Sequence, residues 1–220
     1  MFSWYYWQSV EQGRQYQERK KGWAGNDVKK YKHYIKDLVQ KYQASTMLDY
    51  GSGRGDQYSI PVPYPTETAG VYTDSITFDQ YIGVKSVQQY DPCVSGIDVL
   101  PELSQKFDCV ICTQVLGSIP DADIPEVIKL LATYSTKFCF VSLLDPAQFD
   151  VKIGKTEIYD PEYFKVTRTK QWYFSMFQQH WRGARRRRGA HCYLFFRAGQ
   201  AYNAAWIKQD LAAGNLLKLG

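Results

Sequence analysis

Residues 46–56 are the stretch whose residue types and spacing best suit the binding of a ligand. They read Thr-Met-Leu-Asp-Tyr-Gly-Ser-Gly-Arg-Gly-Asp, so a short apolar strand containing Asp49 runs into three glycines at alternate positions. Glycine adopts backbone angles that other residues avoid, and it lets a ligand approach the main chain closely. A buried strand, a carboxylate and a glycine-rich turn predict an α/β sheet that binds a nucleotide-like ligand at its carboxyl edge.

The spacing of the glycines distinguishes two classes of ligand. A dinucleotide site favours G-x-G-x-x-G, with an acidic residue about 20 positions further on. Here the glycines are Gly51, Gly53 and Gly55, which follow Asp49. These four residues match motif I of the class I S-adenosylmethionine-dependent methyltransferases one by one, and the chain resembles that family. An ordinary glycine-rich turn is the alternative.

Two later segments follow in the order that this resemblance implies. Residues 84–90 are expected to form the second strand, which ends at Asp91 and Pro92. Members of the family hold the ribose hydroxyls there, since a carboxylate accepts two hydrogen bonds from a diol. The alternative is a simple turn, because Asp-Pro starts turns readily. Residues 107–113 form a near-continuous apolar run, which predicts a central parallel strand covered on both faces.

The segment after that strand departs from the family pattern. Residues 114–120 resemble motif IV and its sequel, where many members have an acidic residue followed by Val-Leu-Glu-His-Ile-Pro. Gln114, Gly117 and Ser118 replace the acidic residue, the glutamate and the histidine. These replacements argue against a catalytic base at this position, but they leave a cofactor pocket plausible. The histidines considered as bases elsewhere, His33 and His180, are better explained as ordinary surface or core residues.

The resemblance implies that the chain binds S-adenosylmethionine and transfers its methyl group. The implied cofactor-binding residues are Asp49, Gly51, Ser52, Gly53, Asp91, Pro92 and Thr113. The backbone at residues 51–53 would cradle the amino-acid end of the cofactor, Asp49 would assist its ammonium group, and Asp91 would hold the ribose. Asp98 is a weaker candidate for the adenine side. Because the methyl group is already activated, catalysis needs mainly positioning, and we predict no metal site and assign no catalytic residue.

The positive charge of the chain is concentrated near its C-terminus. The net charge is only +5, yet residues 182–197 contain six arginines and no acidic residue. The candidate substrate-binding residues are Arg185, Arg186, Arg187 and Arg188. They favour an anionic acceptor such as nucleic acid, and neighbouring aromatic side chains could stack on its bases. Two alternatives remain open at this point: a catalytically degenerate methyltransferase-like scaffold, and a nucleic-acid-binding protein led by the arginines.

The order of the expected elements predicts a single α/β domain over residues 1–220. By resemblance it would be Rossmann-like, with a mostly parallel seven-stranded sheet, helices on both faces and an antiparallel last strand. Strands are expected at residues 46–50, 84–90, 96–99, 107–113, 137–144, 171–177 and 190–197, with a helix as the alternative for 171–177. The last two would form a hairpin whose arginine-rich turn, residues 182–189, reaches the ligand-bearing edge. Helices are expected at residues 28–42 and 202–212.

Two accessory segments are expected outside this pattern. Residues 1–25 are aromatic and charged without a clear period, which predicts an irregular arm or a short helix lying over the domain. Residues 57–83 form an insertion rich in proline and tyrosine that begins beside the glycine turn. Long irregular segments of this kind are usually functional or mobile. A lid-like loop over the ligand and a plain surface loop are the two interpretations.

The cysteines favour a reducing compartment over a metal or redox site. The chain has five, and Cys109 and Cys112 form a C-x-x-C within the expected strand 107–113. Positions three apart on a strand lie on opposite faces, so these thiols should be separate and buried. No signal peptide and no apolar run long enough to span a membrane are found, so a cytoplasmic protein without membrane contact is expected.

Overall fold

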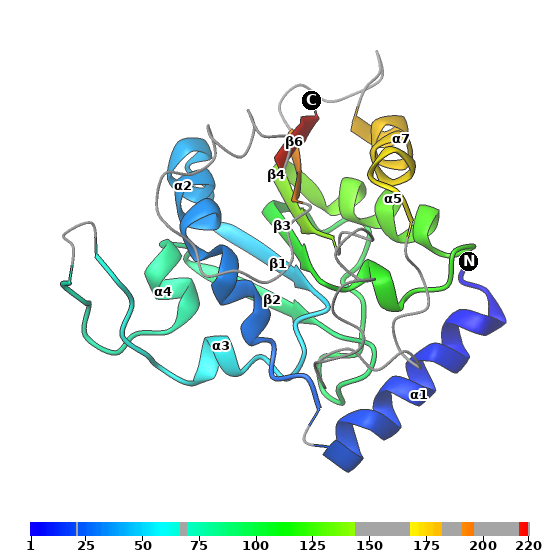
Figure 1. Ribbon diagram of the computed structural model, residues 1–220, viewed down its shortest axis with the longest axis horizontal. Coiled ribbons are helices and arrows are strands. Elements are labelled where there is room, and N and C mark those ends of the chain that lie inside the picture. Colours follow the sequence, from blue (N-terminus) through cyan, green and yellow to red (C-terminus); the bar gives the residue numbers. More distant parts are fainter. Residues whose placement is uncertain (21, 67–69, 144–167, 182–190, 196–215, 220) are drawn as a thin grey trace.

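The computed structural model describes residues 1–20, 22–66, 70–143, 168–181, 191–195 and 216–219, and it has a central sheet with helices on both faces (Figure 1). The strands are β1 Thr46–Tyr50, β2 Ser86–Tyr90, β3 Phe107–Thr113, β4 Ser135–Ser142, β5 His191–Phe195 and β6 Leu216–Leu219. The helices are α1 Trp4–Lys20, η1 Asn26–Tyr31, α2 Lys32–Tyr42, α3 Asp56–Ser59, α4 Phe78–Ile82, η2 Leu116–Ser118, α5 Ile124–Tyr134 and α7 Lys170–Trp181.

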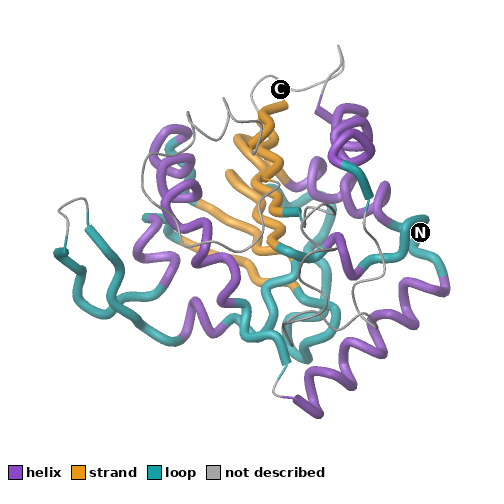
Figure 2. The backbone as a smooth tube through the Cα atoms, in the orientation of Figure 1, coloured by secondary structure: helices purple, strands orange, loops and turns teal. Residues whose placement is uncertain are grey.

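The strands form one sheet in the order β2-β1-β3-β4-β5-β6 (Figure 2). Strands β2, β1, β3, β4 and β5 run parallel, and β6 pairs antiparallel with β5. The prediction of an α/β chain with a mostly parallel sheet is confirmed. The prediction of seven strands does not hold for the described residues, which contain six. Residues 96–99, expected as a strand, lie in turns and irregular backbone instead.

The side chains of β3 explain how the sheet separates two cores. Cys109 and Ile111 pack on the face that also holds the buried residues of α2 and α4. Val110 and Cys112 pack on the opposite face with α5 and α7. Successive residues of a strand point to opposite faces, so a run that is apolar throughout must be covered on both sides. The expected separation of Cys109 and Cys112 is confirmed, and all five cysteines are free.

Helix α7 corrects the expectation of a strand at residues 171–177. Its buried side chains Tyr173, Phe177 and Trp181 recur every four residues, which places them on one helical face. This face packs with α5 over the sheet. The strand that follows, β5, runs parallel to β4. Residues 170–181 are thus a helix rather than the first strand of the predicted hairpin, and its arginine-rich turn, residues 182–189, lies outside the described residues. Arg185, Arg186, Arg187 and Arg188 themselves lie outside the described residues, as does the helix expected at 202–212.

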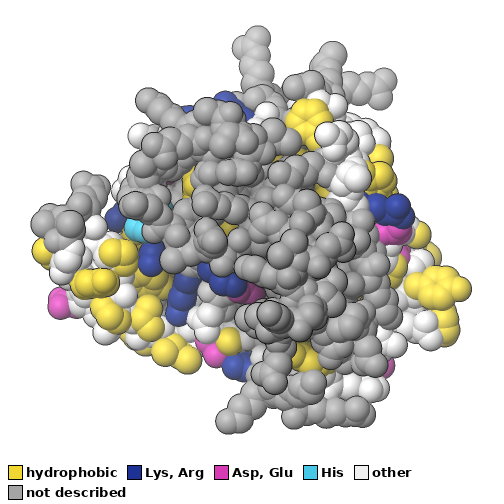
Figure 3. All heavy atoms as spheres, in the orientation of Figure 1, with side chains coloured by type: hydrophobic (Ala, Val, Ile, Leu, Met, Phe, Trp, Pro, Cys, Tyr) yellow, Lys and Arg dark blue, Asp and Glu magenta, His cyan; other side chains and the backbone are white. Residues whose placement is uncertain are grey.

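The N-terminal arm, residues 1–25, is more regular than expected, because α1 is a helix of 17 residues. The insertion at 57–83 contains α3, α4 and two isolated bridges that join Val62 to Ile76 and Pro65 to Tyr72. On the face shown in Figure 3, hydrophobic side chains gather over this insertion; Ile60, Val71 and Tyr72 are among the exposed ones. Among the described helices, none is long and apolar enough to cross a membrane.

Candidate functional site

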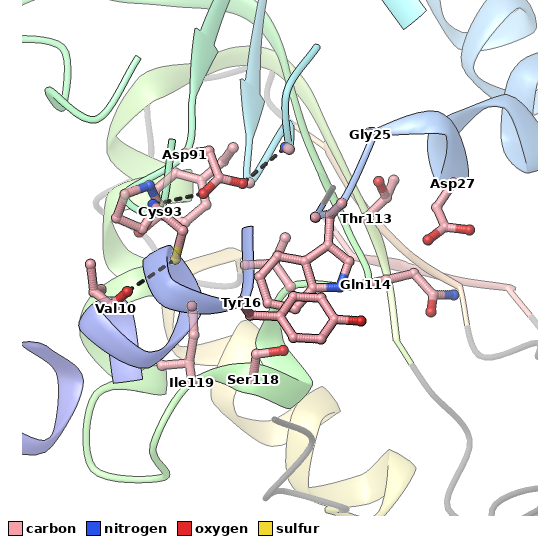
Figure 4. A pocket seen from close by; sticks show the side chains of 18 of the residues that line it. Val10, Tyr16, Gly25, Asp27, Asp91, Cys93, Thr113, Gln114, Ser118 and Ile119 are labelled. Atoms are coloured by element: carbon pink, nitrogen blue, oxygen red, sulfur yellow. Dashed lines mark hydrogen bonds between the residues drawn. The ribbon is translucent and has the colours of Figure 1, made fainter. Parts of the chain in front are cut away.

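A cavity of about 430 Å³ lies where β1, β2 and β3 end (Figure 4). Asp49 and Gly51 reach it from the end of β1, Asp91 follows β2, and Thr113 is the last residue of β3. These three strands are neighbours in the sheet and run parallel. Ligands of open α/β sheets bind outside the carboxyl ends of the strands, and this volume is in the range of small-molecule sites.

The structure brings together most of the residues that the sequence singled out for cofactor binding. Six of the seven predicted residues line the cavity: Asp49, Gly51, Gly53, Asp91, Pro92 and Thr113. Ser52 lies between Gly51 and Gly53 but does not line the cavity, because its side chain is almost fully buried. Asp98 is also absent from the lining and forms an ion pair with Arg14, with 3.0 Å between Nη2 and Oδ2.

The glycine turn is held by hydrogen bonds from its own amides to other parts of the chain. The amides of Gly51 and Ser52 both donate to the Tyr90 carbonyl, at 2.7 and 3.1 Å. The Gly53 amide donates to Oδ2 of Asp91 at 2.9 Å. These donors already have protein acceptors, so the expectation that the turn amides cradle a ligand is not supported. A ligand at this turn would meet carboxylates and carbonyl groups instead.

The segment 22–25 of the arm packs directly on the glycine turn. The Arg54 amide donates to the Trp23 carbonyl at 2.9 Å, and the Asp56 amide donates to the Ala24 carbonyl at 3.0 Å. Gly53 has a φ of +58°, and a Cβ built there would lie only 2.5 Å from the Trp23 carbonyl oxygen. Glycine at this position is therefore required by the close approach of the arm, whether or not a ligand is bound.

Asp91 connects the end of β2 to both the turn and the following residues. Its Oδ2 accepts the Gly53 amide and its Oδ1 accepts the Cys93 amide, both at 2.9 Å. Burial raises the pKa of Asp91, while these two backbone hydrogen bonds lower it. A carboxylate oxygen has more than one lone pair. Asp91 can therefore hold the turn and still accept further hydrogen bonds from a ligand in the cavity.

Asp49 is a buried carboxyl group that is only partly satisfied by its neighbours. Its Oδ2 accepts hydrogen bonds from Tyr58 Oη at 2.7 Å and from Gln57 Nε2 at 3.1 Å. Its Oδ1 is buried without a hydrogen-bond partner among the described residues. Burial raises the pKa of Asp49 from 3.8 to about 7, although Tyr58 and Gln57 lower it. The group therefore titrates near neutral pH, where a nearby cation would favour its ionised form.

Gln114, directly after β3, has a backbone conformation that non-glycine residues rarely adopt. Its φ is +63°, and residues in such conformations are frequent at functional sites. Its amide donates to the carbonyl and hydroxyl oxygens of Ser142 at 3.2 and 3.1 Å. Its side-chain Nε2 donates to Tyr31 Oη at 3.0 Å. The carboxamide therefore lies in a fixed position at the cavity wall, next to Thr113.

The arm forms a wall of the cavity that the sequence patterns did not predict. Tyr6, Val10, Gly13 and Tyr16 of α1 line the cavity together with Trp23. The arm is attached at its start, where the amide and hydroxyl of Ser3 donate to the Asp123 carboxylate at 2.7 and 2.5 Å. Further along, Arg14 Nε donates to the Pro92 carbonyl at 3.0 Å. The signal available in the sequence was the Gly-Trp-Ala-Gly run at residues 22–25.

The described residues of the insertion at 57–83 lie outside the cavity wall. None of its described residues lines the cavity, and in Figure 1 it extends from the opposite side of the molecule to α1. The insertion contributes to the site only indirectly, because Gln57 and Tyr58 donate hydrogen bonds to the Asp49 carboxylate. The lid-like interpretation of this segment is therefore not supported by the described residues. Helix α1 and residues 22–25 line the cavity instead.

The described part of the cavity wall contains no histidine that could act as a general base. His33 and His180 are both outside the lining; His33 Nδ1 is 3.2 Å from Tyr81 Oη, on the α4 side of the sheet. Cys93 lines the cavity, but burial raises the pKa of its thiol to about 12. Within the described part of the chain, no three His, Cys, Asp or Glu residues are grouped as metal ligands.

Comparison of the chain with models of protein families, with characterised proteins and with solved structures finds no match. The geometry and chemistry of the cavity therefore provide the evidence for function.

Proposed function

We propose that this protein binds S-adenosylmethionine in the cavity at the ends of β1, β2 and β3 and transfers the methyl group to a second substrate. One observation carries the proposal. Asp49 and Asp91, at the ends of two neighbouring parallel strands, line one cavity together with Thr113 at the end of a third strand. The sequence motifs that resemble those of the methyltransferases predicted a cofactor site at the same three strand ends.

The charges around the cavity fit a cationic adenosyl ligand. S-adenosylmethionine carries a sulfonium and an ammonium group, and when bound it supplies an activated methyl group. Asp49 offers a buried carboxylate whose Oδ1 has no partner among the described residues. A cation nearby would stabilise the ionised form of this carboxyl group, which burial otherwise disfavours. Among the described lining residues, Lys30 is the only positively charged one, and it forms an ion pair with Asp27.

The roles of the individual residues follow from their positions. Asp91 would accept hydrogen bonds from the ribose hydroxyls with the lone pairs that the Gly53 and Cys93 amides leave unused. The fixed backbone at Thr113 and Gln114 would border the side of the cavity from which the acceptor approaches. The arm would exclude water from the site. Positioning of this kind can lower a barrier by about 7–11 kcal/mol in favourable cases, so the proposal assigns no catalytic residue.

The acceptor is proposed to be anionic, on the strength of the arginine-rich run near the C-terminus. Arg185, Arg186, Arg187 and Arg188 would attract nucleic acid or another anion. If nucleic acid is the partner, its affinity should fall with salt concentration and weaken when these four arginines become serine. An unchanged affinity in that variant would remove nucleic acid from the proposal. We also propose a cytoplasmic location, consistent with five free cysteines.

A second candidate function is a non-catalytic protein that retains the same sheet. The observation that favours it is the glycine turn, whose amides and close approaches are explained by contacts within the chain. The replacement of the acidic residue by Gln114 points the same way. Calorimetric titration with S-adenosylmethionine distinguishes the two candidates. The methyltransferase should bind S-adenosylmethionine, whereas a non-catalytic scaffold that has lost the cofactor site should not. A screen for methyl transfer, with and without nucleic acid, then tests catalysis itself.

A further inference from the structure

The arm places two aromatic rings in the cavity wall. Tyr16 of α1 and Trp23 both line the cavity, and their rings stack with centroids 4.9 Å apart and an interplanar angle of 29°. Figure 4 shows Tyr16 projecting between Asp91 and Cys93 on one side and Thr113 and Gln114 on the other. The pair therefore lines the same cavity as the strand ends. It belongs to the N-terminal arm, for which the sequence patterns predicted no ligand-binding role.

Trp23 has a backbone held by two hydrogen bonds and a ring that lies near the Asp91 end of the cavity. Its backbone amide donates to Gln17 Oε1 at 2.9 Å, and its carbonyl accepts the Arg54 amide at 2.9 Å. A Cβ built on Gly13 would lie 2.4 Å from Cys93 Sγ and 3.7 Å from Trp23 Cζ3. The indole edge is thus close to the loop that begins at Asp91, and the absence of a side chain at Gly13 allows this approach.

We propose that Tyr16 and Trp23 form the base-stacking wall of a nucleoside site in which Asp91 binds the sugar. The assignment of the sugar to Asp91 rests on the proposed function. An aromatic wall next to a carboxylate suits a ligand that has a flat ring joined to a diol, because a base presents a π-face to the rings and a carboxylate accepts the diol hydrogens. An adenosyl group has both parts.

The charges of the lining select a nucleoside over a nucleotide. Asp49 and Asp91 are the buried acidic groups at the strand ends, and Lys30 is already paired with Asp27. Arg14 does not line the cavity and is bound to Asp98 and to the Pro92 carbonyl. A phosphate group would therefore meet carboxylates and no uncommitted cation from the described lining. Adenosine, S-adenosylmethionine and S-adenosylhomocysteine should bind, and AMP should bind more weakly than adenosine.

The test is calorimetric titration of the full chain with adenosine, S-adenosylmethionine, S-adenosylhomocysteine and AMP. We compare wild type with Trp23→Leu, Trp23→Phe and Tyr16→Leu, and we use Trp4→Leu as the matched control. Trp4 is on α1, the helix that carries Tyr16; it is 66% exposed and does not line the cavity. Trp23→Leu and Tyr16→Leu should weaken adenosine about tenfold or more. Trp23→Phe should retain most of the affinity, and Trp4→Leu should leave it unchanged. Near-ultraviolet circular dichroism confirms that each variant is folded.

The outcomes separate this inference from the proposed function. If S-adenosylmethionine binds to wild type and to the folded Trp23 and Tyr16 variants with equal affinity, the stacking wall is wrong and the proposed function stands. If adenosine binds in a Trp23-dependent way but no methyl transfer occurs, the nucleoside site stands and the methyltransferase proposal does not. Tighter binding of AMP than of adenosine, or no binding of any adenosyl compound by folded wild type, would overturn the inference.

Discussion

The Gly53 amide donates a hydrogen bond to Asp91 Oδ2 at 2.9 Å, and this bond joins the turn after β1 to the residue that follows β2. The two strands are paired in parallel from Thr46 and Ser86 to Tyr50 and Tyr90, so their carboxyl ends lie side by side. The other carboxylate oxygen of Asp91 accepts the Cys93 amide. Asp91 is therefore both part of the cavity wall and a structural support of the glycine turn.

Removing the Asp91 carboxylate should affect stability as well as ligand binding. Asp91→Ala leaves the buried Gly53 amide and the Cys93 amide without acceptors, and each such loss costs roughly 1–3 kcal/mol. We expect the free energy of unfolding to fall by about 2–4 kcal/mol in this variant. Asp91→Asn keeps one oxygen acceptor, so the fall in its free energy of unfolding should be about half as large. Urea denaturation at neutral pH measures both.

The neighbouring Asp98 provides the control for these variants. Asp98 pairs with Arg14 near the surface, where the Asp98 side chain is 30% exposed and the Arg14 side chain 44%. Such pairs contribute about 0–1 kcal/mol. Asp98→Ala should therefore change stability little. If Asp91→Ala were as stable as Asp98→Ala, the Asp91 carboxylate would not support the turn as described.

The buried Asp49 should make stability depend on pH. Burial raises its pKa from 3.8 to about 7, so between about these values the folded chain holds a proton that the unfolded chain has released. The free energy of unfolding should therefore fall as the pH rises through this window. The full effect is on the order of 4 kcal/mol above the window. Asp49→Asn should remove this decrease and be more stable than wild type at about pH 8.

Denaturation curves at a series of pH values for wild type, Asp49→Asn and Asp74→Asn test this expectation. Asp74 is exposed in the insertion, and its variant should keep the pH dependence of wild type. A wild-type protein whose stability rises between about pH 5 and pH 8, with Asp49→Asn less stable at the upper end, would mean that Asp49 is ionised and stabilised in the folded chain.

Substitution of Gly53 should disturb the contact between the turn and the arm. Gly53→Ala places a Cβ 2.5 Å from the Trp23 carbonyl oxygen. Gly83 is a matched control, because its φ is +85° and nothing lies within 4 Å of a Cβ built there. Both alanine variants carry backbone strain of about 1–3 kcal/mol, and only Gly53→Ala adds the steric clash. We expect Gly53→Ala to be the less stable variant and to expose the arm to limited proteolysis.

Equal stability and equal protease resistance of these two alanine variants would show that the arm does not approach Gly53 as closely as described.

The attachment of the arm should depend on Asp123 more than on Arg14. Asp123 is 3% exposed and accepts two hydrogen bonds from Ser3. Asp123→Ala should cost about 1–3 kcal/mol in the free energy of unfolding and speed cleavage within residues 1–25. Arg14→Gln breaks an exposed ion pair and should cost less than about 1 kcal/mol. The reverse order of effects, measured by denaturation and limited proteolysis, would place the main attachment at Arg14.

The sequence predicted the strands that carry the site better than the elements around it. Thr46–Tyr50 and Phe107–Thr113 have the bounds that were expected, because both are short apolar runs bounded by clear changes in residue type. Asp49 and Asp91 could be placed near one another because each lies at or just after the end of a parallel strand. This argument needs only the order of the elements.

Helices α1 and α7 were harder to predict because their packing depends on distant partners. In α1 the described buried side chains are only Tyr6 and Val10, together with Gly13, while Trp4 and Trp7 are exposed. Apolar residues therefore surround the helix and give no clear stripe. In α7 the three consecutive aromatic residues 172–174 resemble part of a buried strand, and only burial at Tyr173, Phe177 and Trp181 identifies the helical face. The role of the arm as a cavity wall follows from tertiary contacts that no local pattern contains.

The central claim is that Asp91 and the strand ends around it bind an adenosyl ligand. Calorimetric titration of the full chain with S-adenosylmethionine tests it most directly, with Asp91→Asn and Asp98→Ala measured beside wild type. We predict one site of micromolar affinity in wild type, a similar affinity in Asp98→Ala, and binding at least about tenfold weaker in folded Asp91→Asn. No binding to folded wild-type protein, or an affinity that Asp91→Asn leaves unchanged, would contradict the claim.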